Sequence, residues 1–384
     1  MLKQLYSRYF ADITEIPDLL KSSYLPSLDG FRGISILLVI IGHTCARIDS
    51  DVLQFFFNGH LGVYIFFVIS GFLITTLLLK ERILTGTISL KKFYIRRFLR
   101  IFPVAYLYLI VIFILDHFLH LNVSMFSIGG AALYLQNLNI FYEKEWYTAH
   151  YWSLSIEEQY YLVFPSLLKR NLKFYCFIIP LLLVTVPIAV LICRKVPSLS
   201  DSGIYHFFHF LLKFDGVLTG SFFSILFFKG LIPWTFIKKY KIALNIGLLL
   251  IVMSIHNNHR LEAINHLSSF FIAIIIISNL YKSDDFIYRF LNNKILGKIG
   301  VLSYSLYIWQ QLFTMTKSEP TWSKLPWYSF PVNFVVLFIV SYLSYHYYEK
   351  FFLGLKTRFK VASSEGPQVK DISPRQTIGV NRVD

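Results

Sequence analysis

Long runs of apolar residues, separated by short polar and charged segments, dominate the chain. A membrane-spanning helix needs about 20 mostly apolar residues, and ten such segments can be drawn. They lie at 33–48, 61–79, 101–119, 152–168, 174–193, 209–228, 242–255, 265–281, 296–314 and 329–348. Transmembrane β-strands would instead give short segments of alternating polarity. The pattern predicts an all-α integral membrane protein with about ten transmembrane helices.

Composition supports a membrane protein. Of the 384 residues, 55% are hydrophobic and 15% charged, and the mean hydropathy is +0.55. Soluble domains are about 45–50% apolar and about 25% charged. So much apolar surface excludes an ordinary soluble domain and a disordered chain. The three cysteines, Cys45, Cys176 and Cys193, show no paired spacing, which excludes a disulfide scaffold.

The net charge of +15 is explained by topology. If the N-terminus lies inside and ten spans alternate, 29 of the 37 lysines and arginines fall on the inner side and seven on the outer side. Inner loops of membrane proteins are enriched in positive charge. The distribution predicts that both termini are cytoplasmic, and it removes the need for a nucleic-acid partner.

The chain divides into three predicted regions. Residues 1–27 form a charged cytoplasmic segment, and residues 28–355 form one membrane domain. Residues 356–384 are mostly polar and lack apolar periodicity, which is typical of a disordered cytoplasmic tail. No internal repeat of 20–50 residues is evident.

The first span carries a cation and an imidazole on one face. Arg32 and His43 are 11 residues apart, which is about 20° past three helical turns and about 16 Å along the axis. Ionisable residues within spans are costly and are functional candidates. The arginine suits an anionic ligand, and the histidine suits a general base. The alternative is a histidine bonded within the bundle and an arginine that anchors the span.

A pair of arginines precedes the third span. Arg97 and Arg100 are three residues apart and therefore neighbours on one helical face. Guanidinium groups bind phosphate with two parallel hydrogen bonds, so the pair suits a phosphorylated cytosolic donor. The alternative is contact with anionic lipid headgroups.

Two adjacent carboxylates open the fourth span. Glu157 and Glu158 point about 100° apart, so at most one faces a given site. We expect that residue to be Glu157, which would orient His43. A salt bridge, for instance to Lys213, is the alternative. Lys213 and Asp215 are two residues apart and do not face each other, so each is expected to pair with another span.

The ninth span contains polar side chains. Ser305, Trp309 and Gln310 can line a polar cavity, although hydrogen bonding between helices explains them equally well. Two histidine pairs at i, i+3 lack an obvious third ligand, and the H-E-x-x-H motif is absent. No metal site is predicted.

Several of these segments occur together in a known order. They are LDGFRG and His43 within 28–43, GVYIFFVISGFLI at 62–74, RRFLRIFP at 96–103, HYWSLSIEEQYYLVFP at 150–165, SYSLYIWQQ at 303–311 and YYEK at 347–350. The combination resembles the acyltransferase-3 family of integral membrane O-acyltransferases, and it extends over about 28–355. Bacterial O-antigen, exopolysaccharide and peptidoglycan acetylases belong to that family.

The resemblance implies transfer of an acyl group, usually acetyl from acetyl-CoA, to a hydroxyl of a carbohydrate or glycolipid acceptor. It also implies a multi-pass protein of the bacterial inner membrane that binds no cofactor besides its acyl-CoA donor. Arg32 and His43 fall on the family's arginine–histidine motif, in which the histidine is catalytic, and Arg97 and Arg100 fall on its donor-linked arginine pair. The tryptophan–serine–leucine–glutamate stretch of the family corresponds to Trp152, Ser153, Glu157 and Gln159. Together with Trp309, we assign Trp152, Ser153 and Gln159 to substrate binding.

The chain also departs from the family pattern. Tyr64 stands where many members carry aspartate, Gln310 where many carry histidine, and Lys213 where arginine is common. Gln310 removes a possible second titrating group, so no catalytic role is predicted there. A covalent acyl-enzyme on Ser153 or Ser70 stays open. A glycan transporter or flippase without acyl transfer, and a membrane scaffold with a decayed site, are the alternative functions.

Overall fold

The computed structural model describes residues 2–22, 24–45, 56–138, 140, 145–200, 202–256, 266–314 and 331–359. Every regular element in these ranges is a helix. The all-α fold class predicted from the apolar runs is therefore confirmed for the described part of the chain. Most of the predicted tail, residues 360–384, lies outside the described residues.

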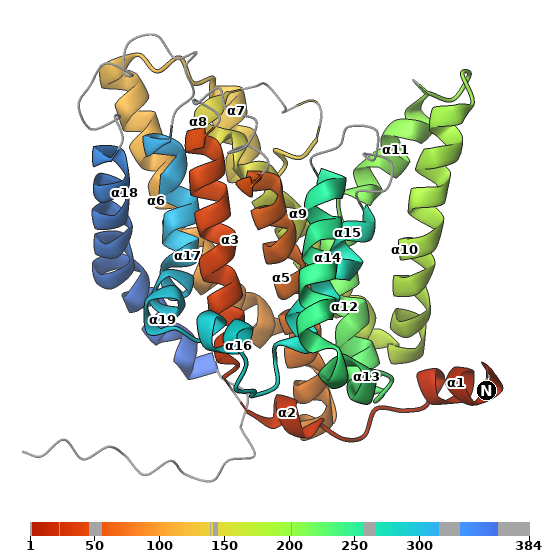
Figure 1. Cartoon of the computed structure of the whole chain (residues 1–384). Helices are drawn as coiled ribbons and strands as arrows, with labels where there is room; N and C mark the ends of the chain where they lie inside the picture. Colours follow the sequence, from red (N-terminus) through yellow and green to blue (C-terminus); the bar gives the residue numbers. More distant parts are fainter. Residues whose placement is uncertain are drawn as a thin grey trace, which may run out of the picture.

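The longer helices lie side by side as a bundle (Figure 1). They are α3 (Pro26–Cys45), α5 (Gly59–Thr85), α6 (Leu90–Leu119), α9 (Tyr151–Arg170), α10 (Leu172–Lys195), α12 (Asp215–Phe228), α14 (Lys241–His256), α15 (His266–Ser278), α17 (Lys294–Phe313) and α18 (Val332–Leu343). These helices follow the predicted apolar segments closely, because the apolar runs are what the bundle buries.

Short helices cover the two ends of the bundle (Figure 1). One end carries α1 (Leu2–Phe10), α2 (Asp18–Lys21), α13 (Trp234–Lys239), α16 (Phe286–Leu291) and α19 (Lys350–Lys356). The other end carries α7 (Met125–Ala132), α8 (Trp146–Ala149) and α11 (Gly203–Leu212). Helices α1 and α19 thus share one end, which places the first and last described segments on the same side of the bundle.

Four helices of the described chain, α3, α5, α6 and α10, are long and apolar enough to cross a membrane. A fifth span results if α11 and α12 are counted as one helix that is bent by 49°. The predicted spans at 152–168, 242–255, 265–281, 296–314 and 329–348 correspond to α9, α14, α15, α17 and α18. That these helices also cross the membrane stays a prediction.

The predicted span at 209–228 is broken at Lys213 and Phe214. Their N–H groups bond to the carbonyls of Phe210 and Leu211, three residues back, which tightens the last turn of α11. The ammonium group of Lys213 donates to the backbone carbonyl of Asn137 at 2.8 Å. The break therefore lets a costly cation reach a partner, as expected for a charge within a span.

Glycine permits a close helix approach in the core. A Cβ atom added to Gly300 of α17 would lie 1.9 Å from the carbonyl oxygen of Asp29 in α3. Only glycine fits such an approach, which is typical of helix pairs in membranes. The contact fixes α17 against α3, and the two helices carry the central residues of the site.

Candidate functional site

A narrow cavity of about 80 Å³ lies between α3, α5, α6, α9 and α17. Its lining includes five residues that the sequence singled out, namely Arg32, Arg97, Arg100, Ser153 and Glu157. The other polar residues of the lining are Ser70, Tyr161, Ser303, Tyr304 and Tyr307. The cavity is much narrower than a second cavity of about 520 Å³ on the other side of α9.

Three guanidinium groups make this cavity cationic. Arg97 lies over the ring of Tyr161, 5.2 Å from its centroid, and Arg32 Nη1 is 3.6 Å from Asp29 Oδ1. Arg100 is the third guanidinium group of the cavity lining. The cavity lining adds only one carboxylate to these three cations. The arrangement favours an anionic ligand, because unbalanced cations away from water need a partner.

Arg96, the neighbour of Arg97 in sequence, has a structural contact instead. Its Nη2 lies 3.2 Å from Glu81 Oε2, and its Nη1 donates to the carbonyl of Phe359 at 2.9 Å. These bonds hold α5, α6 and the last described turn, Thr357–Phe359, together. Arg97 and Arg100 are therefore the members of this basic segment that face the cavity, as their three-residue spacing predicted.

The carboxylate of the cavity is Glu157. The hydroxyl of Tyr161 donates to Glu157 Oε2 at 2.8 Å, and Ser70 shares a short hydrogen bond with the same hydroxyl. Lys213, the alternative partner considered for Glu157, bonds to the carbonyl of Asn137. Glu157 is thus held by hydroxyl groups beside the arginines.

His43 lies near the other end of α3 and is half-buried. Its Nδ1 is 2.7 Å from Gln310 Oε1, and its ring meets the ring of Trp146 edge-on at 5.3 Å between centroids. We expected Glu157 to orient this histidine. The hydrogen-bond partner in the structure is Gln310, and Glu157 belongs to the arginine cavity.

A chain of amide hydrogen bonds fixes the protonation of the His43 ring. It starts at the carbonyl of Trp146, which can only accept, so Gln311 presents its Nε2 there at 2.7 Å. Gln311 Oε1 then accepts from Gln310 Nε2 at 2.8 Å, which turns Gln310 Oε1 toward His43. Thr314 also donates to this oxygen, at 2.9 Å. Nδ1 of His43 must therefore carry the hydrogen, and in the neutral ring Nε2 keeps its lone pair.

The role of Gln310 was missed by the sequence analysis. Since glutamine does not titrate, no catalytic role was predicted for it. The sequence feature that could have indicated this role is the pair Gln310-Gln311 within an apolar span. Both side chains are buried, at 0% and 2% exposure, and buried amides are almost always hydrogen-bonded. A search for their partners would have considered the histidine of the first span.

Two predicted tryptophans lie outside the arginine cavity. Trp152 packs between His60 and Phe67, with ring centroids 6.4 and 5.9 Å away. Trp309 is 6% exposed and meets Tyr108 edge-on at 5.6 Å. Its position is that of a core residue, and its Nε1 has no hydrogen-bond partner among the described residues.

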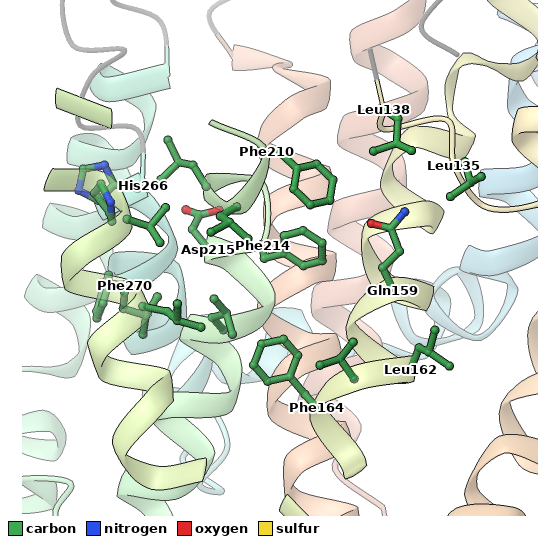
Figure 2. A pocket seen from close by; sticks show the side chains of 18 residues that line it. Leu135, Leu138, Gln159, Leu162, Phe164, Phe210, Phe214, Asp215, His266 and Phe270 are labelled. Carbon is green, nitrogen blue, oxygen red and sulfur yellow. The ribbon is translucent and has the colours of Figure 1, made fainter. Parts of the chain in front are cut away.

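Gln159 faces a second, larger cavity on the other side of α9 (Figure 2). Its Nε2 donates to the carbonyl of Tyr134 and to Asn137 Oδ1, both at 2.9 Å. The amide is therefore satisfied within the protein, and it does not share a cavity with Glu157.

The site thus combines anion-binding groups with an imidazole whose Nδ1 is held by Gln310. Among the described residues, no three histidine, cysteine, aspartate or glutamate side chains gather closely enough to hold a metal ion. The arginines can hold a negatively charged group, and His43 Nε2 can take a proton.

The sequence matches known proteins over most of its length. The profile of the acyltransferase domain matches residues 25–346. The O-acetyltransferase OatA of Staphylococcus aureus strain NCTC 8325 is 28% identical over 375 aligned residues, which cover 88% of this chain and 58% of that protein. A protein of Staphylococcus aureus strain COL, provisionally named an O-acetyltransferase, is 29% identical over 373 aligned residues, which cover 86% of this chain and 57% of that protein.

This chain therefore spans a little over half the length of these relatives. No solved structure matches it. The profile match includes Arg32, His43, Arg97, Glu157 and the whole of α17. Because the match covers most of the sequence and all helices that form the site, the chain belongs to the acyltransferase-3 family.

Proposed function

We propose that this protein transfers an acyl group, most simply acetyl, from acyl-CoA to a hydroxyl of a sugar-containing acceptor. The hydrogen bond between His43 Nδ1 and Gln310 Oε1 carries the proposal, because it leaves Nε2 available as a base. The names of the staphylococcal relatives, which are O-acetyltransferases, support an acetyl group and an oxygen acceptor.

The arginine cavity is the proposed donor site. Acyl-CoA is strongly anionic through its phosphates, and Arg32, Arg97 and Arg100 offer three guanidinium groups at one place. The cavity is narrow, at about 80 Å³, and its three guanidinium groups suit a single anionic group. We therefore place one phosphate or the start of the pantetheine arm in the cavity, with the nucleotide outside and the thioester extending along α3 toward His43.

The proposed reaction proceeds by general-base catalysis. Nε2 of His43 takes the proton of the acceptor hydroxyl while the hydroxyl oxygen attacks the thioester carbonyl carbon. The carbon–sulfur bond then breaks, and the CoA thiolate takes the proton from the imidazolium. The products are an acyl ester and free CoA, and the histidine returns to its starting state. Gln310 stabilises the imidazolium by accepting from Nδ1.

The membrane setting is part of the proposal. We place the protein in the bacterial inner membrane as a multi-pass protein, with the end that carries α1 and α19 in the cytoplasm. The positions of 29 of the 37 basic residues under a ten-span arrangement support this orientation. The donor site then opens toward cytosolic acyl-CoA.

His43→Ala tests the proposal most directly. General-base catalysis contributes about 10²–10⁴-fold to rate, so we expect acetyl transfer and CoA release in proteoliposomes with acetyl-CoA to fall by at least about 100-fold. His346→Ala is the matched control, because His346 is a half-buried histidine outside the arginine cavity whose Nδ1 contacts the carbonyl of Tyr342. Wild-type transfer by folded His43→Ala protein would refute the assignment.

A further inference from the structure

A second cavity of about 520 Å³ lies on the face of α9 opposite to the arginines. It is bounded by α9, α10, α11, α12 and α15. Its wall is almost wholly apolar and includes Leu162, Val163, Leu183, Phe210 and Phe270. Cavities of this size that combine apolar walls with a few polar groups are typical of ligand sites. Figure 2 shows the polar groups Gln159 and Asp215 on different walls, with Phe210 and Phe214 between them.

The cavity is accessible to lipid chains. Leu162 is 67% exposed and Val163 is 50% exposed, although both belong to the bundle helix α9. The neighbouring helix α10 and the bent pair of α11 and α12 are both apolar enough to cross a membrane. In a membrane domain that includes α9, as the sequence predicts, exposed leucine and valine on this helix would face the hydrocarbon of the bilayer. The natural occupant is therefore a hydrocarbon chain.

Asp215 is the carboxyl group in this mostly apolar wall, whose other polar side chains are Gln159 and His266. It is 5% exposed, and Ser269 of α15 donates to its Oδ2 at 2.9 Å. Its Oδ1 has no hydrogen-bond partner within the described part of the chain. A buried carboxyl oxygen without a partner is costly. The residue also begins α12 at the break of a discontinuous helix, where membrane proteins commonly place substrate sites.

We propose that this cavity binds the hydrocarbon chain of a membrane lipid that carries a hydroxyl group, and that this hydroxyl hydrogen-bonds to Asp215 Oδ1. A hydroxyl both donates and accepts, so it pairs with this oxygen whether the carboxyl group is ionised or protonated. It is also uncharged, which matters because an ionic headgroup would lose its hydration in such a wall. Binding gives Oδ1 its missing partner and fills the cavity.

The site has a direct use in acyl transfer. Helix α9 separates this cavity from the arginine cavity, so a lipid and an acyl-CoA donor can be bound at the same time. The lipid would be the hydrophobic part of the acceptor. This use rests on the proposed function, whereas the binding of a hydroxylated lipid does not.

Photolabelling tests the binding. The probes are a 16-carbon alcohol with a diazirine in its chain and the matching hydrocarbon without the hydroxyl, each added to purified protein in phosphatidylcholine vesicles. Mass spectrometry maps the labelled peptides. We expect the alcohol to label the segments 182–187 and 210–218 at least fivefold more than the hydrocarbon does. Equal labelling of these segments by both probes overturns the proposal.

Two variants identify the residues involved. Leu162→Trp places an indole in the cavity and should reduce alcohol labelling at least fivefold, whereas Val184→Trp should not, because Val184 is exposed on α10 outside the cavity lining. Asp215→Leu should reduce alcohol labelling to the level of the hydrocarbon. Unchanged labelling in Leu162→Trp, or a retained alcohol preference in folded Asp215→Leu, overturns the proposal.

A catalytically inactive background separates the two hypotheses. The same labelling in His43→Ala protein should equal that of the wild type, because His43 does not line this cavity. If labelling is selective but no variant affects acetyl transfer, the lipid site stands and the proposed acyl transfer fails. If transfer depends on His43 but labelling is unselective, the proposed function stands and the lipid site fails.

Discussion

Replacing Gln310 by leucine should separate catalysis from donor binding. The change removes the acceptor of the hydrogen bond from His43 Nδ1, which is 2.7 Å long. A buried donor without a partner costs about 1–3 kcal/mol. The tautomer of His43 with a hydrogen on Nδ1 is then destabilised by this free energy relative to the other tautomers and rotamers of the ring. At about 1.4 kcal/mol for each factor of ten in rate, kcat should fall by about 5- to 150-fold.

The KM for acetyl-CoA should stay within twofold, because Gln310 does not line the arginine cavity. The assay is acetyl transfer in proteoliposomes over a range of donor concentrations, with protein amount and thermal stability measured in parallel.

Gln310→Glu keeps an acceptor oxygen and should retain more activity than Gln310→Leu. Thr314→Val removes the second donor to Gln310 Oε1 and should cost less than tenfold. An unchanged kcat in Gln310→Leu would refute the proposed role, and equal losses in the leucine and glutamate variants would indicate a packing effect.

Three further predictions concern other parts of the molecule. Arg97→Ala should raise the KM for acetyl-CoA at least tenfold, measured by steady-state kinetics, whereas Arg170→Ala, at an exposed arginine of α9, should leave it unchanged. Gly71→Ala should lower the Tm, because the new Cβ would lie 1.9 Å from the backbone oxygen of Val217, whereas Gly129→Ala meets no atom within 4 Å and should leave the Tm unchanged. Burial raises the pKa of Asp285, but hydrogen bonds from Lys241 and Ser283 prevail and lower it to about 2. Because this pKa is lower in the folded state, the ionised carboxyl group stabilises the protein at pH values above the ordinary pKa of about 3.9, and this stabilisation is lost as the pH falls toward the folded-state pKa. The free energy of unfolding should therefore fall less steeply between about pH 4 and pH 2 in Asp285→Asn than in the wild type.

The sequence predicted the features that depend on the periodicity of single helices. The apolar runs located the bundle helices, although α3 and α6 begin well before the predicted segments at 33–48 and 101–119. The spacing of Arg97 and Arg100 correctly placed both on one face of α6. The structure also brings Arg32 and Glu157 to the same cavity. These residues are charged and lie within apolar spans, so the cost of burying them indicated that each was a functional candidate, but not that they would share a cavity.

The rotation of each helix about its axis relative to its neighbours was not predictable. His43 and Gln310 are 267 positions apart, and their contact depends on how α17 packs against α3. Glycine at position 300 allows that close approach, but a single sequence does not show which helix a glycine will face. The break in the span at 209–228 was missed for a related reason, since Lys213 is tolerated there through the carbonyl of Asn137, a partner 76 positions away.

Helix geometry also explains why the predicted substrate residues of α9 divide between two cavities. Glu157 and Gln159 are two residues apart, so they point about 200° from each other and face opposite sides. Glu157 accordingly lines the arginine cavity, and Gln159 lines the apolar one. Under the proposed function, the acyl donor and the lipid occupy these two cavities on opposite sides of α9. His43, the proposed base, lines neither cavity and contacts Trp146 of α8, the short helix that precedes α9. The proposal therefore requires both reacting groups to extend out of their cavities to reach His43.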